Sequence, residues 1–261
     1  MRKPVLSVAL SLAVAGAAAA PAQTVDHSLF DGLLRRHVTE GLVDYGAFAR
    51  APELARYLDL LDRVRPDTLP RDEQLAYWIN LYNAATIHLV NKHGERESIR
   101  NINKSFGLLR LKGPWRERFV RAGGALYTLD DVEHGIIRKR FAEPRIHFAL
   151  VCAAMGCPPL RAEAYTGEAL DDQLEDQAEL FLLRTPQKNR VDPAGGKVYV
   201  SQIFRWFSED FGGSREAIGR YIAGFYPEGP EKQRLLSGDF DLIETDYDWT
   251  LNRQEKAPSR R

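Results

Sequence analysis

The chain has 261 residues, enough to bury a sizeable core as one large domain or two small ones. Its 36 basic and 36 acidic residues leave no formal net charge, and this balance argues against a general nucleic-acid-binding protein.

The first 22 residues have the three parts of a secretory signal peptide. A charged start, "MRK", precedes an apolar stretch of about 16 residues, and an Ala-Pro-Ala sequence ends at Ala22. The stretch is shorter than the roughly 20 residues that span a bilayer, and many of its residues are weakly apolar alanines. We therefore predict cleavage after Ala22 and a mature domain over 23–261, located in the periplasm or secreted, with no transmembrane segment.

Helical spacing of apolar residues dominates the first half of the chain. It predicts helices over 27–38, from Pro52 to Pro66, and over 71–94, the last with acids in its first turn and Gly94 as its C-terminal cap. Buried amides need hydrogen-bond partners, so the polar side chains inside the third helix are expected to fix a loop or line a cavity. These side chains are Asn80 and Asn83, and His88 lies on the same helix face as Asn80.

A basic stretch follows over residues 96–121, with eight Lys or Arg and two acids. Its positive charge would suit an anionic surface or substrate. The simpler interpretation, which we favour, is a solvated loop face balanced by the acidic residues near the C-terminus.

The second half mixes short strands with helices. Gly123 and Gly124 mark a hairpin, and Thr128 with Asp131 gives a capping-box start for a helix. The remaining predicted elements are a buried strand or helix over 145–152, a helix over 170–184, a hairpin over 190–201, a helix over 201–213 and an edge strand over 239–252. The predicted class is α+β, a single domain that is mainly helical with a few short antiparallel strands.

Four segments together resemble one known family. They are "AYWINLYNAATIHLV", "LYTLDDVEHGIIR", "PRIHFALVCAAMGCPPLRAEAYTGEALDDQLEDQAELFL" and "VSQIFRWFSEDFGG", within about residues 70–213. In this order they are similar to the domain of unknown function 547 (DUF547). The resemblance implies an exported or envelope domain, and it brings no established reaction with it.

Cys152 and Cys157 are the only cysteines, and three roles are open to them. An exported protein meets an oxidising compartment, which favours a disulfide. Five steps separate the two residues by about 16 Å in a strand, or by about 7.5 Å along a helix with the side chains on different faces. Neither arrangement allows a bridge, so a disulfide requires a tight turn through 153–156, for which Gly156 is suited.

The second role is a nucleophile. Cys157 precedes Pro158 and Pro159 and could begin a short helix whose positive end acidifies a thiol, although the prolines remove backbone donors. His134 would act as the base, oriented by Asp130 one helical turn earlier. The other candidates for this catalytic site are Glu133, His147 and Cys152.

The third role is a zinc site, because His134, His147 and the two cysteines supply ligands that zinc accepts. The chain has no C-x-x-C and no H-E-x-x-H, and it lacks the serine-hydrolase, P-loop and dinucleotide signatures. We therefore predict no metal and no other cofactor.

Two functions from different classes follow. One is a thiol-dependent hydrolase or acyl transferase in the cell envelope. The alternative is a non-catalytic envelope module with a structural Cys152–Cys157 disulfide, whose apolar pocket binds a peptide, a lipid or an envelope protein. The expected pocket residues are Asn80, Tyr82, Asn83, His88, Trp206 and Phe207.

Overall fold

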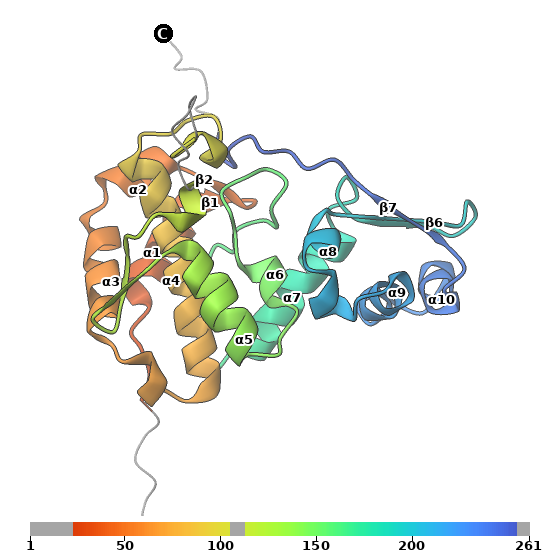
Figure 1. Ribbon diagram of the computed structural model, residues 1–261, viewed down its shortest axis with the longest axis horizontal. Coiled ribbons are helices and arrows are strands. Elements are labelled where there is room, and N and C mark those ends of the chain that lie inside the picture. Colours follow the sequence, from red (N-terminus) through yellow and green to blue (C-terminus); the bar gives the residue numbers. More distant parts are fainter. Residues whose placement is uncertain (1–22, 105–112, 255–261) are drawn as a thin grey trace, which may run out of the picture.

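The computed structural model describes residues 23–104 and 113–254 (Figure 1). The predicted signal peptide lies outside these residues, as does the part of the basic stretch over 105–112.

A central helix, α4 (Arg71–Lys92), organises the N-terminal part of the molecule. Figure 1 shows it between α1–α3 on one side and the later helices on the other. The three helices on the first side are α1 (Ser28–His37), α2 (Tyr45–Arg50) and α3 (Pro52–Arg63), followed by the short η1 (Pro66–Thr68). The predicted helix over 71–94 is confirmed, and because both of its sides are covered, 16 of its 22 residues are buried.

Short β-hairpins lie between some of the helices. The predicted hairpin at Gly123–Gly124 is confirmed, and it pairs β3 (Val120–Ala122) with β4 (Ala125–Tyr127). An earlier hairpin that we did not predict pairs β1 (Val38–Thr39) with β2 (Leu42–Val43). Each of those strands has only two residues, too few to show an alternating pattern.

The remaining strands form one small sheet, ordered β5-β6-β7. The predicted hairpin is confirmed as β5 (Arg190–Asp192) with β6 (Lys197–Val200). The predicted edge strand over 239–252 was too long. Only β7 (Asp241–Glu244) is a strand, and it runs parallel to β6, whereas we expected antiparallel pairs throughout. The rest of that segment crosses back over the molecule as extended chain, with one isolated bridge from Leu251 to Ala154.

The helix predicted after the first hairpin takes an unusual form. Its capping box is confirmed, because the Thr128 and Asp131 side chains each accept the other residue's backbone N–H at 2.9 Å. The turns that follow, η4 (Asp131–Ile137), are π-helical before α5 (Arg138–Arg140). Such wide turns occur often at functional sites.

The other elements complete the C-terminal part. The segment over 145–152 is α6 (Ile146–Ala149) followed by extended chain, and the helix over 201–213 is divided into α8 (Ile203–Trp206) and η5 (Ser208–Phe211). The remaining helices are η2 (Ile99–Asn101), η3 (Pro114–Arg116), α7 (Leu170–Leu183), α9 (Arg215–Ala223) and α10 (Pro230–Ser237).

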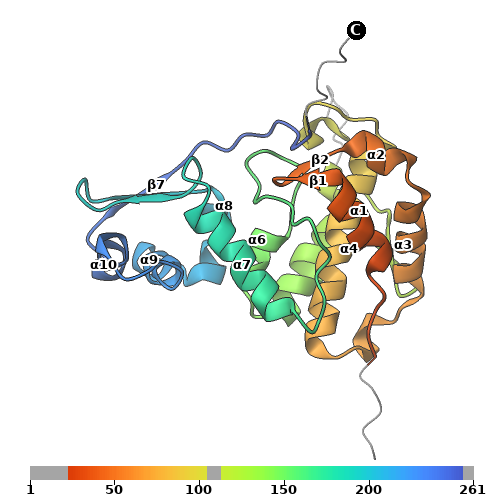
Figure 2. The ribbon, with the colours of Figure 1, turned by 180° about the vertical axis from the view of Figure 1, so that it is seen from behind.

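The buried apolar residues form two clusters. The larger surrounds α4, and the smaller joins α7, α8, α9 and the three-stranded sheet. Figure 2 shows the smaller part as an extension from the helical body, with α6 and α7 between them. Tyr247, on the extended chain after β7, packs against both clusters and so marks the junction. The predicted α+β class is confirmed, and in the described part of the chain we find no helix with the length and hydropathy of a membrane span.

Candidate functional site

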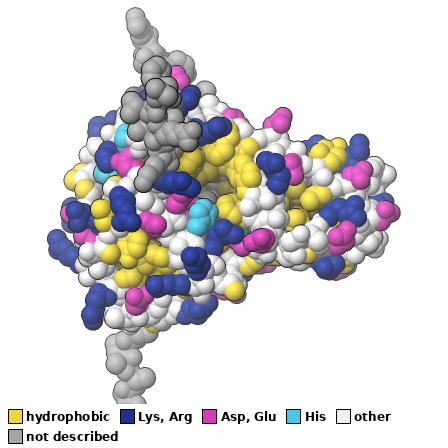
Figure 3. Space-filling view, viewed as in Figure 1, with side chains coloured by type: hydrophobic (Ala, Val, Ile, Leu, Met, Phe, Trp, Pro, Cys, Tyr) yellow, Lys and Arg dark blue, Asp and Glu magenta, His cyan; other side chains and the backbone are white. Residues whose placement is uncertain are grey.

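A pocket of about 250 Å³ opens where the two clusters meet, and we call it the junction pocket. Hydrophobic side chains gather on this face between the body and the extension (Figure 3). All six candidate catalytic residues line it, as do Tyr82, Trp206 and Phe207 of the expected pocket. The other lining residues are Trp115, Leu150, Pro158, Ile203, Tyr247 and Trp249.

One wall of the junction pocket is a disulfide between Cys152 and Cys157, whose Cα atoms are 6.2 Å apart. The chain between them makes the tight turn that such a bond requires. Ala153 takes a left-handed φ of 60°, and the Cys157 N–H donates to the Ala154 carbonyl at 3.0 Å. A Cβ on Gly156 would lie 2.7 Å from the Tyr247 ring, so only glycine allows this close approach.

The disulfide changes what the cysteines can do. In this bonded state Cys157 has no thiol to act as a nucleophile. Residues 158–169 form no helix, so the predicted helix start at Cys157 is wrong. Adjacent prolines at 158 and 159 favour extended chain before each ring, which explains the loop.

The two sulfur atoms have different surroundings. Cys157 is 1% exposed, and its Sγ accepts the Cys152 backbone N–H at 3.1 Å and the Tyr247 hydroxyl at 3.2 Å. Cys152 is half-buried, and its Sγ lies 3.1 Å from the same hydroxyl. Burial raises the pKa of Tyr247, so its hydroxyl keeps the proton that it donates.

A cation contacts the backbone of Cys157 without lining the junction pocket. The Lys188 Nζ donates to the Cys157 carbonyl oxygen at 2.5 Å. Burial lowers the pKa of Lys188 to about 8, so at neutral pH the ammonium form still predominates.

Glu133 places a buried carboxyl in the pocket. Its side chain is 12% exposed and lines the junction pocket together with Tyr82. Removal from water raises the pKa of Glu133, because the charged form loses its hydration. The carboxyl therefore keeps its proton to a higher pH than a solvated glutamate does.

The predicted orientation of His134 by Asp130 is wrong. Asp130 pairs instead with Arg116 at 3.1 Å, and the carboxylate nearest to His134 belongs to Glu133, with Oε1 4.0 Å from Nδ1. The cause is the π-helical turn over 131–137, because a wider turn removes the alignment of residues four apart that an α-helix would give. The His134 side chain is 44% exposed at the pocket edge.

His147 makes a short hydrogen bond to a carboxylate outside the pocket lining. Its Nε2 lies 2.6 Å from Asp210, which also accepts two bonds from Arg138 at 2.6 and 2.9 Å. The ring stacks on Phe207 with centroids 4.0 Å apart, and the side chain is 1% exposed. Burial lowers the pKa of His147 to about 4, and the Arg138 charge adds to this, so the imidazole is neutral at pH 7.

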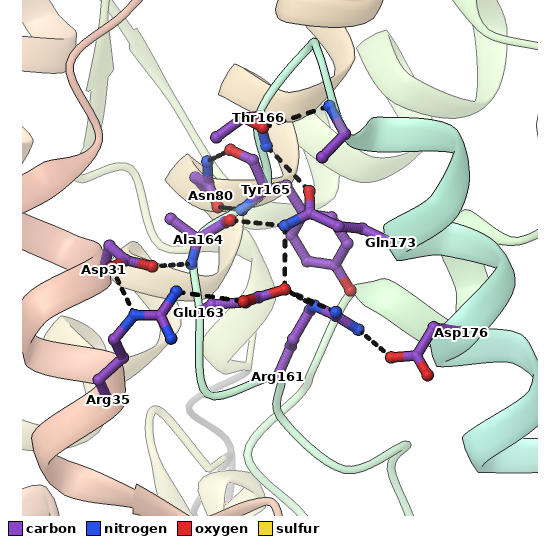
Figure 4. Close-up of polar contacts among 11 residues, drawn as sticks. Asp31, Arg35, Asn80, Arg161, Glu163, Ala164, Tyr165, Thr166, Gln173 and Asp176 are labelled. Atoms are coloured by element: carbon purple, nitrogen blue, oxygen red, sulfur yellow. Dashed lines mark hydrogen bonds and ion pairs between the residues drawn. The ribbon is translucent and has the colours of Figure 1, made fainter.

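Asn80, Asn83 and His88 do not line the junction pocket. The Asn80 side chain bonds both the N–H and the carbonyl of Tyr165, as Figure 4 shows beside the ion pairs of the same loop. Asn83 holds the Ala149 carbonyl and the Val151 N–H, just before the disulfide. The two amides thus fix neighbouring loops, whereas His88 stacks on Phe119.

Sequence reasoning missed Asp210, Tyr247 and two of the tryptophans. Asp210 is 63 residues from its partner His147, and no spacing rule links them. Of the far wall, the sequence had indicated Trp206 and Phe207, and the aromatic residues at 247 and 249 were a further signal that was not used. Within 23–104 and 113–254, no group of three or more His, Cys, Asp or Glu side chains is placed to hold a metal.

The fold and site define an α+β protein with a disulfide-walled pocket at the junction of two apolar cores. Residues 66–182 match the model of a family described as "Protein of unknown function, DUF547", so the resemblance to this family is confirmed over that stretch. The match includes the disulfide and both pocket histidines, but the wall formed by Trp206, Tyr247 and Trp249 lies beyond it. Neither the curated proteins nor the solved structures gave a match to the chain.

Proposed function

We propose that the protein is an exported envelope module that binds a peptide segment by taking one uncharged, apolar side chain into the junction pocket. The observation that carries this is the wall composition: three of the chain's four tryptophans, with Tyr247 and Phe207, surround a single cavity. Pockets with aromatic walls and few polar groups are typical of ligand sites.

The size of the pocket supports a side chain as the ligand. Its volume of about 250 Å³ falls below the roughly 300–1,000 Å³ of pockets that enclose a whole small molecule. One aromatic or aliphatic group fits this space, whereas a lipid tail needs more length. The alternatives of a lipid and of a folded envelope protein are outcomes of the binding test.

The polar groups of the pocket support an uncharged ligand. His147 is neutral and committed to Asp210, and burial favours the protonated form of Glu133. A charged group that entered would lose its hydration without an unpaired partner of opposite sign in the wall.

Export is supported by the pattern of residues 1–22 and by the disulfide. Disulfides persist in the periplasm and outside the cell and are rare in the cytosol. A pocket with a disulfide as one wall fits this environment.

Tryptophan fluorescence tests the binding proposal directly, because three of the four indoles line the cavity. We expect blocked peptides with a central Phe or Leu to change the tryptophan emission on binding. They should bind about tenfold or more tightly than the same peptide with Ala at its centre, since burying such a side chain contributes roughly 1.5–3 kcal/mol. Trp206→Ala should abolish this preference. Leu236→Ala, which removes a remote exposed side chain on α10, is the matched control.

Equal binding of the Phe, Leu and Ala peptides, or equal effects of the two variants, would contradict a side-chain pocket. Binding of fatty acids but not of peptides would point to the lipid alternative.

A thiol-dependent hydrolase or acyl transferase is the second candidate function. It is favoured by the gathering of all six candidate catalytic residues in one pocket, next to the His147–Asp210 pair. A histidine held by a carboxylate is the base that an activated thiol needs. This function requires the disulfide to be reduced first, so a model thioester should be cleaved only after reduction and not by Cys157→Ser. No cleavage by the reduced protein would exclude it.

A further inference from the structure

The two sulfurs of the disulfide differ in access. Both cysteines line the junction pocket, but Cys152 is half-buried whereas Cys157 is 1% exposed. Thiol–disulfide exchange depends on which sulfur an attacking thiolate can reach. The greater exposure of Cys152 therefore favours attack on that residue.

The same two sulfurs differ in how well each would carry a negative charge. The Tyr247 hydroxyl lies 3.1 Å from the Cys152 sulfur and 3.2 Å from the Cys157 sulfur, so it can donate to either. In the described part of the chain, the Cys157 sulfur alone also accepts a backbone hydrogen bond, from the Cys152 N–H at 3.1 Å. Hydrogen bonds to a charged form favour that form, and a sulfur that is a more stable thiolate is a faster leaving group. The Lys188 ammonium on the Cys157 carbonyl adds positive charge to the same side. Both differences thus act in one direction.

We infer that the Cys152–Cys157 disulfide is redox-active, accepting electrons from a dithiol whose thiolate attacks Cys152, the more exposed of the two cysteines. This activity goes beyond peptide binding and does not depend on it. The attacking sulfur forms a bond to Cys152 Sγ, the Cys152–Cys157 bond breaks, and its electron pair stays on Cys157 as a thiolate held by the two donors.

The second half of the exchange completes the balance. The other thiolate of the dithiol attacks the sulfur that is bound to Cys152, forms the dithiol's own disulfide and releases Cys152 as a thiolate. One dithiol is oxidised, the protein disulfide is reduced by the same two electrons, and the two cysteine thiolates take up the protons that the dithiol lost.

The test measures reduction of the native protein by dithiothreitol, followed by alkylation and intact mass. We expect a rate that is proportional to dithiothreitol concentration and that does not follow the rate of global unfolding. A rate that is independent of the reductant and equal to unfolding would show a closed structural bond and overturn the inference.

Tyr247→Phe removes one donor to Cys157 and keeps the ring, so reduction should slow about tenfold, the effect of losing a bond to a charged group. Tyr221→Phe is the matched control. Tyr221 is also a partly buried tyrosine, and its hydroxyl has no hydrogen-bond partner among the described residues. Urea denaturation checks that both variants fold. Equal rates for the two variants would overturn the role of Tyr247.

The sulfur that is attacked can be identified on the wild-type protein, without a variant. With glutathione as the reductant, rapid alkylation should trap a mixed disulfide, and peptide mapping should place the glutathione on Cys152. A glutathione adduct mainly on Cys157 would contradict the inferred order of attack. Loss of peptide binding with normal exchange would instead remove only the proposed function.

Discussion

Replacing His147 by glutamine removes an imidazole that the fold holds in its neutral form. Burial, together with the Arg138 charge, lowers the His147 pKa to about 4, against 6.5 for a solvated histidine. Between these two values the unfolded chain binds a proton and the folded protein does not. The free energy of unfolding therefore falls as the pH falls through this window.

The size of the effect follows from the two pKa values. Lowering the pH from about 7.5 to about 5 should cost the wild type about 2 kcal/mol of stability through His147. The amide of His147→Gln can still donate to Asp210, but it does not titrate. The stability difference between the wild type and the variant should therefore shrink by about 2 kcal/mol on acidification.

Urea denaturation at several pH values, followed by tryptophan fluorescence, measures this difference. His27 and His88, whose pKa values burial also lowers, are present in both proteins and cancel. A difference that stays constant with pH would refute the neutral imidazole. A difference that grows in acid would show that a protonated His147 and Asp210 form a stabilising ion pair.

Three further substitutions test the parts of the structure around the site. Asn80→Ala leaves the buried N–H and carbonyl of Tyr165 without partners, and it should lower the free energy of urea unfolding by about 3 kcal/mol; a loss below about 1 kcal/mol would contradict the contact. Gly156→Ala places a Cβ 2.7 Å from the Tyr247 ring and should destabilise by about 1–3 kcal/mol in the same assay, whereas an unchanged urea midpoint would show that the ring moves freely. Glu133 has a raised pKa, so the wild type loses stability as the pH rises from the ordinary pKa of 4.5 to the raised one. Glu133→Gln should accordingly gain in melting temperature relative to the wild type as the pH rises from about 4 to 7, and a gap that does not change would show that Glu133 ionises normally.

Much of the fold could be predicted because its signals are local. The helix α4 has charged residues that fit its ends and a glycine that follows it, and the hairpin at Gly123–Gly124 has the turn residues that it needs. The π-helical turn over 131–137 has no such signal, since its sequence reads equally well as an α-helix. The parallel pairing of β7 with β6 depends on a long return of the chain, which local patterns do not encode.

The candidate site divides in the same way. Its near wall lies on one stretch of chain, and the sequence indicated Glu133, His134, His147 and both cysteines as residues of interest. The far wall comes from 203–249, which reaches the pocket only because a second core cluster packs beside the first. Asn80 and Asn83 were recognised as buried amides, but whether they held loops or lined a cavity depended on where those loops ran.

Thiol counting on the native protein tests most directly whether a Cys152–Cys157 disulfide forms one wall of the pocket. The protein is expressed with its first 22 residues, collected from the oxidising compartment, and treated with an alkylating reagent before and after reduction. We predict a mass without adducts before reduction and with one adduct on each of the two cysteines afterwards. Two adducts on folded protein that was never reduced would contradict it.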